Sequence, residues 1–307
     1  MSENTEEEKE AFLDFIQEGQ DRCRFICDYL EKGGVKSSVL HINGKKHILI
    51  NFPKECYNGY FRIKTIIAHY DRVPQSPGAN DNSFAVFTLM KWAIRLNQSM
   101  REHNIRLIFT DGEEISSAAE KKEGQKSILE EQGAFDLAGV FKRLGITGDD
   151  VFVFDCMGRG SVPVLGKPFI LEKAQSSFKK RYNELQERAK EILSKASPSA
   201  WLNLPVSLSD NAGFIASGIP AVVITMLPQE EASKYMFNLV KYPPLEAYVT
   251  NKSIPTGCDT KTLLSLLPKT WLFLHSPYDN AESISWESQN VFINILNVIR
   301  DLKLIFL

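Results

Sequence analysis

Histidine and carboxylate side chains follow several apolar stretches of this 307-residue chain. The first stretch, residues 63–68, leads into His69, Tyr70 and Asp71. In an extended chain His69 and Asp71 point to the same side, so Asp71 is placed to accept a hydrogen bond from one imidazole nitrogen and leave the other for a cation. For an isolated pair of this kind, a hydrogen-bonded structural histidine at a strand end is the simpler interpretation.

Five such side chains recur along the chain, two imidazoles and three carboxylates. They are His69, Asp81, Glu114, Asp155 and His275. This set of nitrogen and oxygen ligands suits zinc or another divalent first-row metal. Five protein ligands are more than one open catalytic zinc normally takes. One bridging carboxylate would instead give each of two metals three protein ligands and a shared position for water.

An alternation of predicted strands and helices surrounds these residues. The predicted strands are residues 35–42, 47–52, 62–69, 105–110, 151–154, 205–208 and 221–226. The predicted helices are residues 5–32, 84–96, 125–144, 169–197 and 286–304. Such alternation predicts an α/β fold, a three-layer α/β/α sandwich around a mostly parallel mixed sheet, with the functional side chains just past the carboxyl ends of its strands.

One domain over residues 1–307 is the economical interpretation, because no repeat, low-complexity tract or clean linker interrupts the chain. Residues 1–34 contribute an N-terminal helix. Residues 228–261 lack a clear period and are rich in proline, which predicts a lid or insertion over the site. Its Tyr242 and Tyr248 are candidates for a specificity pocket, although a structural role ranks higher. His41 and His47, in the predicted edge hairpin, are expected to be surface residues rather than ligands.

The composition excludes some classes of function. Net charge is −2 and the isoelectric point is near 6.3, so the Lys/Arg excess of a nucleic-acid-binding protein is absent. No apolar run is long enough to span a membrane. The five cysteines form no metal-binding pattern and are expected to be free thiols. The chain as given has no signal peptide, so a cytoplasmic location is expected, with a secreted parent whose leader has been removed as the alternative. No pattern indicates an oligomeric state.

Taken in order, the motifs resemble those of the M28 zinc peptidases. The matching segments are Ala68-His69-Tyr70-Asp71, Gly78-Ala79-Asn80-Asp81-Asn82, Thr110-Asp111-Gly112-Glu113-Glu114, Phe154-Asp155-Cys156-Met157-Gly158, Ser209-Asp210-Asn211 and His275-Ser276-Pro277-Tyr278-Asp279-Asn280. A single match is weak evidence, but six in the family's order are strong. The resemblance implies a phosphorylase/hydrolase-like fold, two zinc ions, and a peptide or aminoacyl substrate with a free N-terminus.

The resemblance also implies a role for each ligand. Asp81 bridges the two metals, Glu114 and His275 complete one site, and His69 and Asp155 complete the other.

Three further residues gain roles in the same way. Glu113 is the general base, whose carboxylate reaches the attacking water while that of its neighbour binds metal. Asp71 and Asp279 orient the two histidines. A cis peptide bond is expected between Asp81 and Asn82.

Two departures from the family pattern concern substrate binding. Asn211 stands where the family commonly has histidine, so an ionisable group is missing there. Residues 115–119 lack the glycine-rich turn that frequently follows Glu114. Substrate preference is therefore poorly constrained by the sequence.

Two other functions remain open. Glutaminyl cyclases have the same fold and share the spelling of residues 109–114; they hold one zinc with the equivalents of Asp81, Glu114 and His275 and form N-terminal pyroglutamate. Those enzymes typically carry Trp before the last histidine, where this chain has Leu274, and this difference favours a hydrolase. A catalytically inactive interaction module would be expected to lack ligands, whereas all five are retained.

Overall fold

The computed structural model describes residues 5–114, 131–169, 174–250 and 257–305. Within these residues an eight-stranded sheet has the order β1-β2-β4-β3-β5-β8-β6-β7. The strands are β1 (Ser37–Ile42), β2 (Lys45–Ile50), β3 (Lys64–His69), β4 (Ile105–Thr110), β5 (Asp150–Phe154), β6 (Val162–Gly166), β7 (Leu202–Leu204) and β8 (Ala221–Leu227). Strands β4, β3, β5 and β8 are parallel neighbours. The pairs β1–β2, β2–β4 and β6–β8 are antiparallel, and β7 is parallel to β6.

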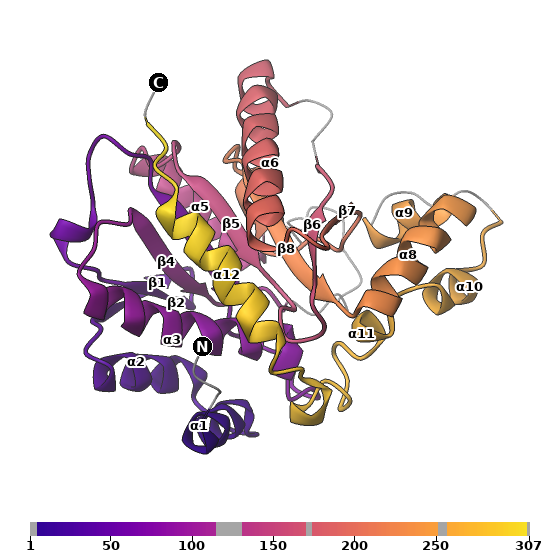
Figure 1. The fold of residues 1–307 in the computed structure, drawn as a ribbon, viewed down its shortest axis with the longest axis horizontal. Coiled ribbons are helices and arrows are strands. Elements are labelled where there is room, and N and C mark those ends of the chain that lie inside the picture. Colours follow the sequence, from indigo (N-terminus) through magenta and orange to yellow (C-terminus); the bar gives the residue numbers. More distant parts are fainter. Residues whose placement is uncertain (1–4, 115–130, 170–173, 251–256, 306–307) are drawn as a thin grey trace.

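Helices cover both faces of this sheet. They are α1 (Glu6–Ile16), α2 (Arg22–Lys32), α3 (Phe84–Ser99), α5 (Gly133–Arg143), α6 (Ser176–Ala196), α7 (Asn211–Ala216), α8 (Gln229–Lys241), α9 (Pro244–Val249), α10 (Thr260–Ser265), α11 (Lys269–Leu272) and α12 (Ser288–Asp301). Figure 1 shows α3 and α12 lying across one face. The predicted three-layer α/β/α architecture is therefore confirmed.

The central strands are apolar on both sides because each face is covered. Every position of β3, β5 and β8 is buried, as expected for parallel strands between two helical layers. Along β3, Ile66 and Ala68 join a hydrophobic cluster with α1, α2, α3, α6 and α12. Ile67 points the other way and joins a second cluster with α5, α7, α8 and α9. Among the described residues, no helix is long and apolar enough to cross a membrane.

The single N-terminal helix predicted over residues 5–32 is wrong, because the structure has two helices there. The first ends at Ile16, and Gly19 adopts a positive φ of 76° that favours glycine. Asp21 then begins α2 by accepting a hydrogen bond from the backbone N–H of Arg24. Both halves are amphipathic, so the apolar period continues across the break and conceals it.

The segment 228–261 is more regular than its sequence suggested. It contains α8 and α9, separated at Pro243, while residues 251–256 lie outside the described ranges. Its period is obscured because Met236, Phe237 and Val240 are 44%, 61% and 80% exposed on the outer face of α8. In Figure 1, α8 to α11 form a group at one side of the sheet. The lid role of this segment, and the single domain over residues 1–307, stay predictions.

Smaller errors lie at the far edge of the sheet. A strand predicted at residues 205–208 is found at Leu202–Leu204, and its neighbour β6 was not predicted.

Three other predictions can be compared with the structure. The second half of the predicted helix 125–144 forms α5, while residues 115–130 are outside the described ranges. His41 is exposed as expected, but His47 is fully buried, because β2 lies between β1 and β4 rather than at the edge. All five cysteines are free.

Candidate metal centre

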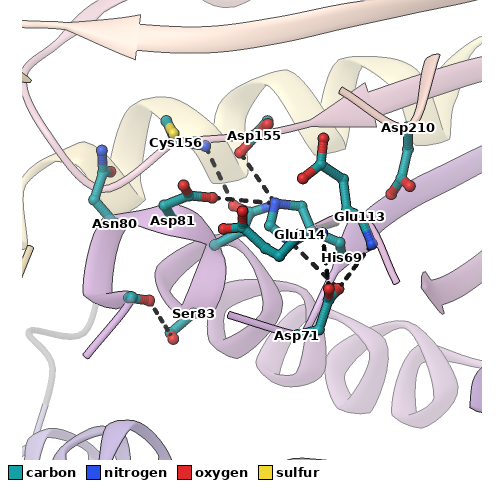
Figure 2. A network of polar contacts seen from close by, with 12 residues as sticks. His69, Asp71, Asn80, Asp81, Ser83, Glu113, Glu114, Asp155, Cys156 and Asp210 are labelled. Carbon is teal, nitrogen blue, oxygen red and sulfur yellow. Dashed lines mark hydrogen bonds and ion pairs between the residues drawn. The ribbon is translucent and has the colours of Figure 1, made fainter. Parts of the chain in front are cut away.

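The five predicted ligands come together at the carboxyl edge of the parallel strands. His69 ends β3, Asp155 directly follows β5, and Glu114 lies four residues beyond the end of β4. Asp81 lies in the turn Ala79–Ser83 that precedes α3, and His275 lies in the loop after α11. Figure 2 shows Asp81, Glu114 and Asp155 around the imidazole of His69. Segments distant in sequence meet here because parallel strands end at one edge.

Asp81 lies between the two histidines. One of its carboxylate oxygens, Oδ1, is 3.2 Å from His69 Nε2, and the other, Oδ2, is 3.2 Å from His275 Nε2. His69 Nε2 is also 3.5 Å from Asp155 Oδ1, and His275 Nε2 is 3.0 Å from Glu114 Oε2. Two groups of one imidazole and one carboxylate thus share Asp81, the arrangement expected of a bridging ligand.

The donor atoms fit a divalent metal. Among the described residues, His69 Nε2, Glu114 Oε1 and Asp155 Oδ1 are buried and make no hydrogen bond. Buried polar atoms without a partner are rare because leaving them unsatisfied costs free energy. His69, Asp81 and Glu114 also place one ligand atom each within 4.8 Å of one another. A cation held by these imidazole and carboxylate atoms would satisfy them, and zinc prefers such ligands.

The carboxylates around the two histidines favour positive charge at this site. Burial opposes protonation of His69, yet Asp155, Asp71 and Asp81 raise its pKa well above the usual value of 6.5. Hydrogen bonds to Asp81 and Glu114 raise the pKa of His275 to about 10. Both shifts reflect the same concentration of carboxylates, which would equally stabilise a bound cation.

Asp71 has two contacts that matter for the site. Its Oδ1 lies 3.6 Å from His69 Nδ1, on the ring side away from the other carboxylates, as predicted for an orienting residue. Its carboxylate also accepts the backbone N–H groups of Glu113 and Glu114, at 3.3 and 2.9 Å. Although burial opposes its charge, His69 and these N–H groups hold the pKa of Asp71 below its usual value. Asp71 therefore fixes the main chain of the acidic pair as well, which the sequence did not reveal.

Glu113 faces the cavity beside the centre and is surrounded by other acids. Burial, together with Asp155 and Asp210, raises its pKa well above the usual value. Its Oε1 accepts a hydrogen bond from Gln132 Nε2 at 3.3 Å. Figure 2 shows Glu113 between His69 and Asp210.

Asp210 is a functional candidate that the sequence analysis did not select. It is fully buried, accepts a hydrogen bond from Thr110 Oγ1 at 2.5 Å, and has a pKa raised to about 7, chiefly by burial. Asp210 belongs to the Ser209-Asp210-Asn211 motif, in which the departure from the family pattern lies at Asn211. Asn211 Oδ1 accepts the backbone N–H of Ser209, so Asn211 shapes the start of α7.

The turn that carries Asp81 is held by hydrogen bonds from its backbone N–H groups to Asp279. The carboxylate of Asp279 accepts the N–H groups of Asn80 and Asp81 at 2.7 and 3.0 Å. Asp279 therefore positions Asp81. Among the described residues no hydrogen bond or ion pair joins Asp279 to His275, and the orienting role expected for Asp279 stays a prediction. The predicted cis peptide bond between Asp81 and Asn82 is confirmed.

Two asparagines beside Asp81 connect this turn to the loop after β5. Asn82 donates to the carbonyl of Phe154 at 2.8 Å and accepts the N–H of Cys156 at 3.2 Å. Asn80 accepts the N–H of Gly158 at 2.7 Å. These bonds set Asp81 relative to the strand end that supplies Asp155. An amide suits position 82 because it can donate one hydrogen bond and accept another.

A cavity of about 550 Å³ opens beside the centre. Asp81, Glu113, Asp155 and His275 line one side of it. The remaining wall is mostly apolar and includes Val206, Val223, Val249, Leu267, Trp271 and Leu274. Tyr248 of α9 also lines it, so the segment 228–261 contributes to the cavity, as anticipated. The shape and lining suit a ligand with one polar and one apolar end.

Comparison with solved structures supports the fold. A glutaminyl cyclase from Bacteroides thetaiotaomicron, bound to N-acetylhistamine, is 16% identical, with a TM-score of 0.63 and 96% of each chain covered. A leucine aminopeptidase precursor from B. thetaiotaomicron VPI-5482 is 17% identical, with a TM-score of 0.61, covering 96% of this chain and 95% of the other. The zinc aminopeptidase BSAP from Bacillus subtilis is 18% identical, with a TM-score of 0.50 over 83% of this chain; this chain spans about half of its length, 48%.

Comparison with families gives a more specific result. No curated protein matches the chain. The family model of Peptidase family M28, however, matches residues 62–299, which include every ligand of the candidate centre. The chain therefore belongs to peptidase family M28.

Proposed function

We propose that the chain is a zinc-dependent aminopeptidase with two metals, which removes N-terminal residues from peptides. The observation that carries this proposal is the position of Asp81, with one carboxylate oxygen 3.2 Å from each histidine. With Asp155 on one side and Glu114 on the other, each metal would have three protein ligands. An open position then remains at each metal, which catalytic zinc sites require.

Bound zinc would polarise the substrate carbonyl and lower the pKa of a water molecule. The chain itself contributes the base: Glu113 takes the proton from the attacking water and gives it to the leaving nitrogen. Glu113 lines the cavity while its neighbour Glu114 lies 3.0 Å from His275.

The open position at the second metal would suit a substrate with a free N-terminus, because a neutral α-amine could bind there as a ligand. The carboxylates beside it, Asp81 and Asp155, line the cavity and would hold that metal. The apolar wall opposite would hold the side chain of the first residue. Such a site selects for chain ends because an internal residue has no amine to place there.

A glutaminyl cyclase is the second candidate, favoured by the structural likeness to a solved cyclase. That reaction would need one zinc, held by Asp81, Glu114 and His275. The hydrolase is preferred because His69 and Asp155 complete a second group of ligands. Leu274 lines the cavity where the cyclases resembled by this chain carry Trp.

Metal analysis combined with two assays tests the proposal. One assay follows release of free amino acid from aminoacyl amides, and the other follows pyroglutamate formation from peptides that begin with Gln. Two zinc ions per chain with release of amino acid are expected. One zinc with pyroglutamate would establish the cyclase instead, and a fully metal-loaded protein with neither activity would favour the inactive interaction module.

A further inference from the structure

A buried arginine lies below the turn that carries Asp81. Arg22 is the first residue of α2 and is 6% exposed. Its guanidinium lies 4.6 Å from the ring centre of Phe15 in α1 and donates a hydrogen bond to Ser83 Oγ. Burying a charged side chain is costly, so this arrangement requires a compensating partner.

Ser83, which accepts the hydrogen bond from Arg22, also bonds to the residue before the start of the same turn. Its hydroxyl donates to the carbonyl of Gly78 at 2.5 Å, a bond drawn in Figure 2. Gly78 has a φ of 62°, and an added Cβ would lie 2.6 Å from the carbonyl oxygen of Asp81. Gly78 and Ser83 are therefore the two ends of a tightly closed turn with Asp81 between them. Arg22 binds at the point where this turn closes.

The charge of Arg22 also faces the site. Burial, and next the charge of Arg72, lower the pKa of Arg22 to about 9, so it stays protonated at neutral pH. The acids that favour its charge are Asp71, Asp81 and Asp279. Arg72 links α1 to the same turn. It donates hydrogen bonds to the carbonyls of Ile16 and Gln17 at the end of α1, and to the carbonyl of Pro77 just before the turn.

We infer that Arg22 is a positioning residue of the metal centre, through which the N-terminal helices set the place of the bridging carboxylate Asp81. The inference rests on the proposed function only in taking Asp81 as a metal ligand. It extends the site beyond residues 62–299, the part that the family model matches. Two effects of Arg22 oppose each other: its bond to Ser83 fixes the ligand, whereas its positive charge repels a cation. We expect the positioning of Asp81 to outweigh the repulsion of the cation, because Arg22 bonds directly to Ser83 in the turn that carries Asp81.

Zinc affinity, measured on the full chain by competition with a chelator, tests this inference. Arg22→Gln removes both the charge and the guanidinium donor to Ser83, and is expected to weaken zinc binding about 10-fold or more, as for other residues that orient ligands. Arg22→Lys should recover part of the loss. Ser83→Ala keeps Arg22 but removes its acceptor and should weaken binding in the same direction. The absorption spectrum of the cobalt-loaded protein should change in the two Arg22 variants and in Ser83→Ala.

Arg188→Gln is the matched control. Arg188 forms a two-point ion pair with Asp150, at 2.6 and 2.8 Å, at the amino end of β5 and thus opposite to the strand ends that carry the ligands. Its loss should lower stability without changing zinc affinity or the cobalt spectrum. Unchanged or tighter zinc binding by Arg22→Gln would overturn the inference, since it would leave only the repulsion. If that variant does not fold, Ser83→Ala decides alone. Because no substrate is used, a wild-type chain that binds zinc but fails to release amino acids would refute the proposed function and leave this inference standing.

Discussion

At the scale of single residues, the adjacent acids Glu113 and Glu114 are expected to have separable roles. Glu113→Gln should lower kcat on aminoacyl amides by about 10²- to 10⁴-fold, because an amide cannot take the proton from water. Its zinc content should stay at the wild-type level, since Glu114 and not Glu113 lies in the ligand cluster. Activity and metal content measured on the same preparation test this. Glu187→Gln, at an exposed position of α6, is the control, and wild-type kcat in the Glu113 variant would reassign the base.

The sharing of Asp81 makes a second prediction, about metal stoichiometry. His69→Ala removes a ligand from one group only, so about one zinc per chain should remain. Asp81→Asn weakens both groups at once, because each of its oxygens faces a different histidine, and should reduce the affinity for both ions. Metal analysis after dialysis distinguishes the two variants. Equal loss in both would mean that the two groups do not bind metal independently.

Sequence reasoning located the ligands better than the residues that hold them. His69, Glu114 and Asp155 each follow an apolar strand, and strand ends can be recognised from local pattern. The residues that support Asp81 cannot be recognised in this way. The bond from Asp81 N–H to Asp279 spans 198 residues of chain, and the bond from Arg22 to Ser83 spans 61. Such contacts depend on the packing of whole elements, which one sequence does not reveal.

At the scale of elements, α9, α11 and the loop after α11 contribute Val249, Trp271 and Leu274 to the apolar wall of the cavity. Leu274→Trp should occupy part of the cavity beside that wall. The KM should therefore rise about 10-fold or more for leucine or phenylalanine amides, with a smaller effect on alanine amide. Steady-state kinetics on the three amides measure the difference. Leu272→Trp is the control, because Leu272 is 42% exposed and does not line the cavity. An equal change for all three amides would show that the wall does not hold the substrate side chain.

The same elements show where pattern reading failed. The buried strands β3, β4, β5 and β8 were predicted because continuous apolar runs have few alternatives in an α/β protein. By contrast, β6 has Pro163 within it and pairs antiparallel to β8 at Met226, so it lacks the signals of a central strand. In α8, Phe237 is exposed to solvent, so the apolar residues of this helix do not mark its buried face in the sequence. Errors concentrated where binary patterning is weakest, and the elements that carry the ligands were spared.

At the scale of the whole molecule, two histidines buried away from the ligand cluster should make the fold sensitive to acid. Burial lowers the pKa of His47 and of His103 to about 4. In each, Nδ1 accepts a backbone N–H, from Asp111 at 3.3 Å and from Ile105 at 3.0 Å. Protonation of that nitrogen would replace an acceptor by a donor and break the bond. Both rings must therefore stay neutral in the folded protein.

The sign of the pH effect follows from these lowered pKa values. Above pH 6.5 the histidines are neutral in both states, but between about pH 6.5 and 4 the unfolded chain binds protons that the folded chain excludes, so the free energy of unfolding falls on acidification. The loss from pH 7 to 4.5 should be on the order of 2 kcal/mol per histidine. His103→Asn, whose side-chain oxygen still offers an acceptor, should flatten the dependence by about that amount in urea unfolding at both pH values. Metal release cancels in the comparison with wild type, and His41→Asn on the exposed face of β1 controls for the substitution itself. An unchanged slope in the His103 variant would show that this ring takes up its proton without opening the fold.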